Sequence, residues 1–177
     1  MQGPVYGFDT NEINGNEKIY TSFSYDDIFG TVLNRFIVQA VAGETLTVYG
    51  NGSQKRGYLN ITDSIKCIDI ATKFPASKGE LNIFNQYTET FSIIQLAKKV
   101  IEAGKKIGIN AKFKNIKNPR VEKENHYYKH SNKKFIKLGL KPNFLTQKIL
   151  CEMIIKVEKH KKSIKNKNFL PTVNWNE

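Results

Sequence analysis

Arginine is scarce in this chain of 177 residues. It occurs only at Arg35, Arg56 and Arg120, and every other basic side chain among the 28 Lys+Arg is lysine. Lysine therefore supplies the ordinary charge, and a retained arginine indicates a place where a planar group with five donors is useful, as in binding phosphate or carboxylate. Composition alone equally allows three incidental surface arginines.

Cysteine and long apolar runs are also scarce. Cys67 and Cys151 are the only cysteines, and their separation matches no zinc-ligand spacing, so we expect two reduced thiols packed in helices. No apolar run approaches the roughly 18 residues of a membrane-spanning helix. The first residues lack the basic and apolar regions of a signal peptide. These absences predict no membrane partner and a reducing, cytoplasm-like compartment.

Charge is unevenly distributed along the chain. The net charge is +12, yet residues 1–97 carry seven Lys/Arg against ten Asp/Glu, and residues 98–167 carry 21 against five. A basic half can bind nucleic acid, but these lysines are scattered over helical stretches without a nucleic-acid-binding motif. We therefore interpret them as solvated helix faces rather than as a nucleic-acid site.

Hydrophobic periodicity predicts alternating helices and short strands. We expect helices over residues 26–42, 61–74, 92–103, 131–138 and 146–163, and strands over residues 46–49, 58–61, 81–84 and 111–116. Thr62 or Asp63 should cap the second helix, and Gly104 should close the third. A polar loop covers residues 7–25, and a polar tail covers residues 166–177. The pattern indicates an α/β or α+β body with few strands for its length.

One segment combines three glycines with a single arginine. Gly50, Gly52 and Gly57 surround Arg56 between two predicted strands. Glycine lets the backbone approach a ligand closely, and Arg56 could form a two-pronged contact with a diphosphate. Residues 47–49 could present backbone groups and an aromatic edge to a base. Taken alone, the segment is equally consistent with an ordinary hairpin that binds no ligand.

Several collinear motifs resemble a single family. They are QGPVYG at residues 2–7, FGTVLNRFIVQAVAGETLTVYGNGSQKRGYL at 29–59, FNQYTETFS at 84–92, NPRVEKENHYY at 118–128, LGLKP at 138–142 and PTVNW at 171–175. Together they resemble the C-terminal half of extended short-chain dehydrogenases/reductases acting on sugar nucleotides, the NAD-dependent epimerases and dehydratases. The FNQYTE, PRVE and HYY motifs are specific to the sulfolipid-synthesising branch of that family.

The resemblance implies both a fold and an activity. Residues 1–177 would form the C-terminal, sugar-nucleotide-binding part of an α/β Rossmann-type enzyme, without the N-terminal Rossmann half. Members of the branch convert UDP-glucose and sulfite to UDP-sulfoquinovose with bound NAD. In that reaction NAD oxidises C4, water is lost across C5–C6, sulfite adds at C6 and the hydride returns. The expected location is the cytoplasm, or the plastid stroma of a photosynthetic eukaryote.

The resemblance also assigns residues to ligands. Gln2 and Val5 correspond to contacts with the nicotinamide end of NAD. Thr47–Tyr49 would line the uracil, and Gln54–Arg56 the ribose and diphosphate. Two arginines on one diphosphate would hold the sugar in a fixed register for hydride transfer. The full substrate set is Val32, Leu33, Asn34, Arg35, Thr47, Val48, Tyr49, Gln54, Lys55, Arg56, Arg120, Glu122 and Tyr127.

Two parts of the family's machinery do not occur in this sequence. It contains no Gly-x-x-Gly-x-x-Gly turn for the NAD pyrophosphate, and none of its eight tyrosines is followed four residues later by lysine. We therefore assign no catalytic residue and no metal, and expect the 177 residues alone to bind sugar nucleotide without turnover. An N-terminal half or a second copy would complete the enzyme. Two alternatives stay open: part of another nucleotide-sugar epimerase or dehydratase, or a non-catalytic basic binding module.

Overall fold

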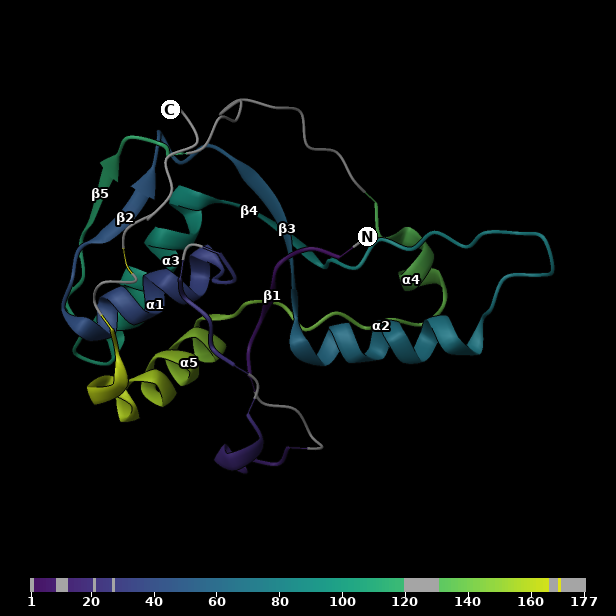
Figure 1. The fold of residues 1–177 in the computed structure, drawn as a ribbon, viewed down its shortest axis with the longest axis horizontal. Coiled ribbons are helices and arrows are strands. Elements are labelled where there is room, and N and C mark those ends of the chain that lie inside the picture. The colour runs from purple at the N-terminus through teal and green to yellow at the C-terminus, as the bar shows by residue number, and fades with distance from the viewer. Residues whose placement is uncertain are drawn as a thin grey trace. The chain divides into compact units, whose positions relative to one another are not determined.

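The computed structural model describes residues 2–8, 13–20, 22–26, 28–119, 131–165 and 169 (Figure 1). Helices and short strands alternate along these residues, as the sequence predicts. Their order is β1 (Val5–Tyr6), a 3-10 turn (Glu17–Ile19), α1 (Val32–Ala42), β2 (Leu46–Tyr49), β3 (Lys55–Asn60), α2 (Ile61–Lys73), β4 (Glu89–Ser92), α3 (Ile93–Lys106), β5 (Phe113–Ile116), α4 (Lys133–Lys137), α5 (Gln147–Lys159) and a last 3-10 turn (Lys161–Ser163).

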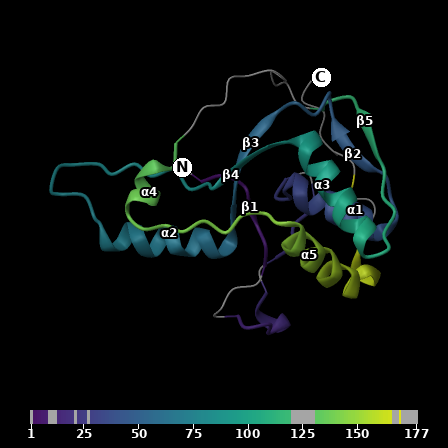
Figure 2. The same cartoon turned by 180° about the vertical axis from the view of Figure 1, so that it is seen from behind.

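The strands form two small sheets. One sheet has the order β1-β3-β4, and the other joins β2 to β5, which lie side by side in Figure 2. β1 pairs with β3 in parallel, with Val5 opposite Leu59, and β2 pairs with β5 in parallel, with Leu46 opposite Phe113. Parallel pairing requires a crossover connection rather than a hairpin. The α/β prediction is therefore confirmed.

The chain divides into two compact units. Unit 1 contains the described residues within Met1–Ser22, Arg56–Thr90 and Tyr127–Phe144, and unit 2 those within Phe23–Lys55, Phe91–His126 and Leu145–Glu177. Two of the boundaries between the units fall inside strands, one in β3 and one in β4. Each unit has its own core.

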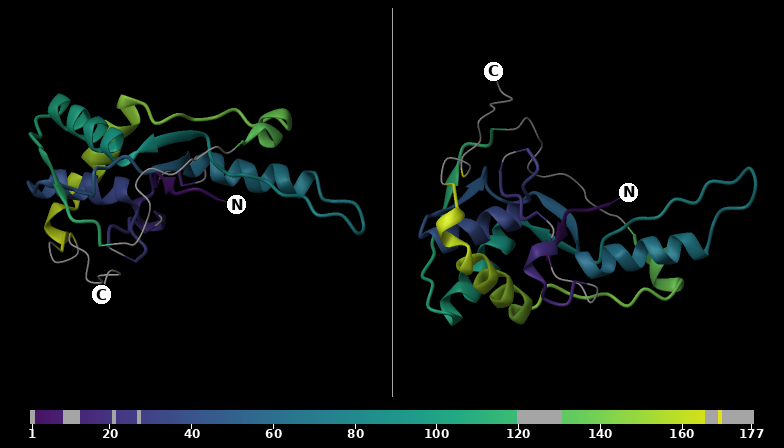
Figure 3. Two further views of the ribbon diagram at one scale, coloured as in Figure 1. Left: turned by 90° about the horizontal axis from the view of Figure 1, so that it is seen from above. Right: turned by 60° about the horizontal axis from the view of Figure 1, so that its bottom comes forward.

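Unit 2 contains three helices that pack together, and two of them, α1 and α3, also contact β2. α1, α3 and α5 contact one another (Figure 3). Thr31 caps α1, its Oγ1 accepting from the Asn34 N–H at 3.2 Å, and Gly43 ends the helix with φ +81°. Ser92 and Gln95 form the predicted capping box at the start of α3. The core consists of apolar side chains at most 4% exposed: Leu33, Phe36, Ile37, Leu46, Val48, Leu96, Val100, Leu150, Met153 and Ile154.

Unit 1 has a smaller core around β3 and α2. Leu59, Cys67, Phe135 and Leu140 are buried together, and Val5, Ile70 and Phe84 pack against them. The Phe84 and Phe135 rings stack with centroids 4.7 Å apart. α4 therefore reaches this core through Phe135.

Two predicted elements differ from the structure. The helix expected from residue 26 begins at Val32, because Asp26 Oδ1 accepts from the Ile28 and Phe29 N–H groups and makes a turn there. The strand expected over residues 81–84 is wrong, because no strand of the described chain pairs with it. The nearby strand is β4, which the sequence pattern did not predict.

The predicted ends of two helices also need correction. Asn60 caps α2, its Oδ1 accepting from the Thr62 N–H at 2.9 Å, so neither Thr62 nor Asp63 is the cap. α3 continues through Gly104 to Lys106. A Cβ on Gly104 would lie 3.0 Å from the Ile109 carbonyl oxygen. The glycine therefore serves a close backbone approach rather than a helix end.

Candidate functional site

Arg35 is packed inside unit 2, where it holds β2. The side chain is 8% exposed on α1. One guanidinium nitrogen, Nη2, donates to the Thr47 carbonyl at 2.9 Å, and Cζ lies 4.1 Å from the centroid of the Tyr49 ring. A planar cation can bond the backbone and stack on a ring at once, whereas an ammonium cannot. Arg35 therefore positions two of the predicted uracil-facing residues.

Gln39 holds the same strand one helical turn further along α1. Its Nε2 donates to Thr47 Oγ1 at 3.0 Å, and its Oε1 accepts from the Thr47 N–H at 3.1 Å. Both residues are nearly inaccessible, with Gln39 1% and Thr47 3% exposed. The sequence analysis missed Gln39. The available signal was a polar residue four positions after Arg35 in an otherwise apolar helix.

The glycine-rich turn after β2 packs on the start of α3. Gly50 and Gly52 have φ +59° and +75°. A Cβ on Gly52 would lie 2.7 Å from Val48 Cγ1, so only glycine fits without a shift. The carbonyl of Gly52 accepts from the Ile94 N–H at 3.0 Å. One backbone N–H of the first turn of α3 is therefore already bonded to the glycine-rich turn.

Two predicted substrate residues have buried oxygens without a hydrogen-bond donor in the described part of the chain. Gln54 is 2% exposed; its Nε2 donates to the Tyr49 carbonyl at 3.3 Å, while its Oε1 is unsatisfied. Asn34 is 8% exposed; its Nδ2 donates to the Ser24 carbonyl at 3.0 Å, while its Oδ1 is unsatisfied. Buried polar atoms are normally satisfied, so each oxygen could accept from a donor outside these residues.

The remaining predicted residues are distributed as follows. Leu33 and Val48 are fully buried, so their side chains belong to the core. Val32 is half-buried and Lys55 is exposed. Both belong to unit 2, which contains all the substrate residues predicted at positions 32–35, 47–49, 54 and 55. Arg56 is half-buried and falls in unit 1 with Gln2 and Val5. Arg120, Glu122 and Tyr127 lie outside the described residues.

Unit 1 contains a buried polar network that the sequence analysis did not predict. The Tyr6 hydroxyl lies 3.0 Å from both Glu89 Oε2 and the Asn143 carbonyl oxygen, and these two acceptors share its single proton. The buried Asp63 carboxylate accepts from the Asn143 N–H at 2.7 Å and from the Asn143 side-chain amide. Burial, then the nearby Glu89 carboxylate, raise the pKa of the Tyr6 phenol far above its ordinary value. The phenol therefore acts as a donor that ties β1 to the segment before α5.

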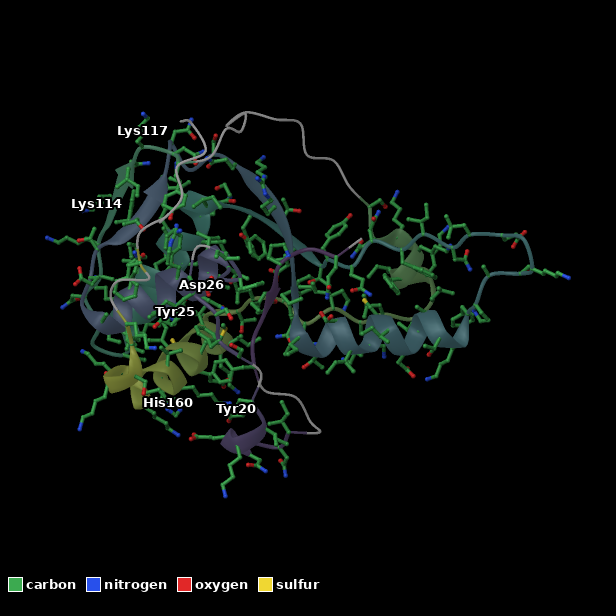
Figure 4. The ribbon with its side chains drawn as sticks, in the orientation of Figure 1. Tyr20, Tyr25, Asp26, Lys114, Lys117 and His160 are labelled. Atoms are coloured by element: carbon green, nitrogen blue, oxygen red, sulfur yellow. The ribbon has the colours of Figure 1, made fainter. Side chains whose placement is uncertain are left out.

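The lysines of unit 2 include an exposed set near β5. Lys112, Lys114 and Lys117 are exposed, and the side chains of Lys114 and Lys117 point outward in Figure 4. This arrangement fits the interpretation as solvated faces. No three His, Cys, Asp or Glu side chains gather as metal ligands would within the described residues. No helix there is long and apolar enough to cross a membrane.

The sequence and the fold match one family of enzymes. A family model described as NAD dependent epimerase/dehydratase matches residues 17–85. The predicted resemblance to that family is confirmed.

Two relatives carry the same enzyme name. The UDP-sulfoquinovose synthase of Spinacia oleracea, described as chloroplastic, is 44% identical over 174 residues, which are 98% of this chain and 36% of that protein. The UDP-sulfoquinovose synthase of Sulfolobus acidocaldarius is 42% identical over 142 residues, which are 80% of this chain and 36% of that protein. The chain therefore spans 36% of the length of each relative.

A solved structure shows the same fold. The UDP-glucose 4-epimerase of Thermotoga maritima, determined with UDP-glucose, superposes with a TM-score of 0.64 at 20% identity, over 90% of this chain and 45% of that one.

Proposed function

We propose that this chain is the sugar-nucleotide-binding part of a UDP-sulfoquinovose synthase-like enzyme, which converts UDP-glucose and sulfite to UDP-sulfoquinovose with bound NAD. The observation that carries the proposal is the 44% identity to the spinach enzyme over 98% of the chain. In that enzyme, this chain would contribute the residues that bind the UDP group.

The geometry of unit 2 supports a nucleotide site at β2. Arg35 and Gln39 fix the backbone of Thr47 from two sides, so a base lying against Thr47–Tyr49 would meet preorganised groups. The unsatisfied oxygens of Asn34 and Gln54 are acceptors. The ribose hydroxyls and the uracil N–H are donors, so a uridine is a chemically matched ligand.

The diphosphate is assigned to Arg56 and Arg120, the pair that the family resemblance places there. Arg56 is half-buried and follows the glycine turn, and Arg120 is its proposed partner. Two guanidinium groups would neutralise both phosphates through charge-assisted bonds, which lysine makes only as a point charge. Lys55, Glu122 and Tyr127 are proposed as neighbouring contacts.

The NAD assignment rests on two residues of unit 1. Gln2 is exposed, and its Nε2 donates to Ser64 Oγ at 2.8 Å, while Val5 packs on the core of that unit. Gln2 and Val5 could contact one edge of a bound cofactor. Two residues do not form a complete NAD site. NAD, when bound, supplies the hydride acceptor for the sugar; the chain's residues would orient the substrate towards it.

Titration calorimetry at low salt tests the proposal. UDP and UDP-glucose should bind, and glucose should not. Replacing Arg56→Lys and Arg120→Lys together should weaken binding about tenfold or more, because two forked contacts are lost. Lys114→Arg, at an exposed position outside the predicted substrate set, is the matched control and should bind as the unmodified chain does.

Two results would refute the proposal. One is the absence of any UDP-dependent heat at millimolar ligand. The other is tight binding of single-stranded nucleic acid that falls steeply with salt, which would favour a basic binding module instead.

A further inference from the structure

After α5 ends, the chain returns to Tyr25, which lies just before α1 (Figure 4). The Lys165 N–H donates to the phenol oxygen of Tyr25 at 2.9 Å. The rings of Phe169 and Tyr25 have centroids 6.0 Å apart at an angle of 50°, the spacing and tilt of a favourable aromatic pair. Phe169 is only 6% exposed, so its side chain is packed within unit 2. Lys165 and Phe169 are here called the C-terminal strap.

Tyr25 is adjacent in sequence to the backbone group that holds Asn34. The Nδ2 of Asn34 donates to the Ser24 carbonyl at 3.0 Å. That carbonyl and the Tyr25 Cα belong to one planar peptide unit. A contact that restrains Tyr25 therefore also restrains the direction of the carbonyl to which Asn34 is bonded.

The backbone between Tyr25 and α1 is closely packed as well. A Cβ on Gly30 would collide with the carbonyl carbon of Tyr25, so the backbones of these two residues are in contact. Thr31, the next residue, caps α1 by accepting from the Asn34 N–H at 3.2 Å. Asn34 is thus connected to Tyr25 twice, by its backbone through Gly30 and Thr31 and by its side chain through Ser24.

The bond to Ser24 determines which end of the Asn34 carboxamide is left for a ligand. The side chain is 8% exposed, and its Oδ1 has no donor among the described residues. While Nδ2 is bonded to Ser24, the other end of the group is the acceptor Oδ1. A released carboxamide could rotate and present the donor Nδ2 instead. A donor on the ligand, such as the N–H of uracil, is matched only by the held orientation.

We propose that the C-terminal strap is a positioning element of the sugar-nucleotide site. By restraining Tyr25, Lys165 and Phe169 keep the Asn34 carboxamide turned so that its acceptor meets the nucleotide. The strap residue Lys165 and Tyr25 are 140 positions apart in the sequence, so a change near the end of the chain should alter the affinity of a site formed near its beginning. The inference rests on the proposed function, since it takes its ligand from there.

Two substitutions at one position isolate the hydrogen bond of the strap. Lys165→Pro removes the backbone N–H that bonds Tyr25, whereas Lys165→Ala removes the same exposed side chain and keeps the N–H. Ile164 has φ −71° and ψ 130°, the extended conformation that a residue before proline prefers. In titration calorimetry, UDP-glucose should bind Lys165→Pro about threefold to tenfold more weakly than Lys165→Ala.

Substitutions of the two rings test the same contact from both sides. Tyr25→Phe keeps the ring and loses the acceptor, so it should weaken UDP-glucose binding as Lys165→Pro does. Phe169→Ala removes the ring contact and should weaken binding about tenfold or more, and Phe169→Leu should recover part of that loss. Phe74→Ala removes a phenylalanine that is 47% exposed in unit 1 and should bind as the unmodified chain does. Thermal unfolding identifies a temperature at which each variant is folded.

NMR of the ligand-free chain measures the effect of the strap on Asn34 directly. The Nδ2 protons of Asn34 should exchange with water about tenfold faster in Lys165→Pro than in Lys165→Ala, because their bond to Ser24 opens more often. A purely structural role of the strap would lower the melting temperature without changing this signal. If Lys165→Pro does not fold, Tyr25→Phe is compared with the unmodified chain in both measurements.

The outcomes separate this inference from the proposed function. Weaker UDP-glucose binding together with faster exchange at Asn34 supports the inference. Equal affinities of Lys165→Pro and Lys165→Ala overturn it alone, as does an unchanged Asn34 side-chain signal. Absence of UDP-glucose binding by the unmodified chain overturns the proposed function and this inference with it.

Discussion

The guanidinium of Arg35 lies over the ring of Tyr49, with Cζ 4.1 Å from the ring centroid, while Nη2 donates to the Thr47 carbonyl at 2.9 Å. One side chain of α1 thus fixes both the backbone and the aromatic ring of β2. Most basic residues of the chain are lysines. We infer that this position carries arginine because a planar group can bond the backbone and stack on the ring at once. Its effect on a bound nucleotide is indirect, through the strand that it holds.

Arg35→Lys should therefore destabilise the fold. Lysine keeps the charge and loses both the stacking and the planar fork, which predicts a loss of about 1–3 kcal/mol in the free energy of unfolding. Urea denaturation measures it. Lys114→Arg, at an exposed position, serves as the comparison and should change stability by less than about 0.5 kcal/mol. Equal effects of the two substitutions would contradict the assigned roles.

The reciprocal pair of Gln39 and Thr47 predicts strong coupling. Gln39→Leu leaves the buried N–H and hydroxyl of Thr47 without that partner and should cost about 2 kcal/mol. Thr47→Val removes the hydroxyl, so the double variant should lose less than the sum of the single losses, by about 1 kcal/mol. Strict additivity in this double-mutant cycle would mean that the two side chains do not interact in solution.

Gly52 should tolerate no side chain. Gly52→Ala combines φ +75° with a Cβ 2.7 Å from Val48 Cγ1 and 3.2 Å from Ile94 Cβ, and should cost about 3 kcal/mol. Gly43 has a similar φ of +81° but no atom within 4 Å of its added Cβ. Gly43→Ala should cost only about 1 kcal/mol. Similar thermal shifts for the two variants would show that the turn is looser than described.

Stability should fall at high pH through Cys67. Burial, then the nearby Asp63 carboxylate, raise the pKa of its thiol from 9.0 to about 11. The native state therefore favours the protonated thiol. This stabilisation is complete below pH 9 and is lost as the pH rises towards 11.

The matched variant for this effect is Cys67→Ala, which has no thiol to ionise. The stability difference between the unmodified chain and this variant should shrink by about 2 kcal/mol between pH 8 and pH 11, measured by urea unfolding under reducing conditions. A difference independent of pH would place the thiol in contact with water.

Local chemistry made part of the fold predictable. The Ser92 capping box and the Thr146 cap of α5 depend on neighbours in sequence, and the structure contains both. The predicted strand at residues 46–49 is also present, because β5 pairs with it. Residues 81–84 have equally strong strand propensity but form no strand, because pairing needs a second chain segment. β4 depends on such a partner and was missed for the same reason.

The candidate site was predictable only as a set of segments. Residues 32–35, 47–49 and 54–56 were assigned to ligands mainly from a resemblance, which does not say which of them are buried. A polar residue four positions after Arg35 was a local signal for Gln39. Its bonds to Thr47, and the inward direction of Arg35, follow from how α1 packs on β2, which is a tertiary property.

The central claim is that Thr47–Tyr49 and Gln54 meet a uridine diphosphate. An NMR titration of the isotope-labelled chain with UDP-glucose tests it most directly, with glucose as the control ligand. The account predicts amide shifts concentrated at residues 47–56 and at the side-chain amide of Gln54, and none with glucose. Shifts confined to other residues, or none at millimolar UDP-glucose, would contradict it.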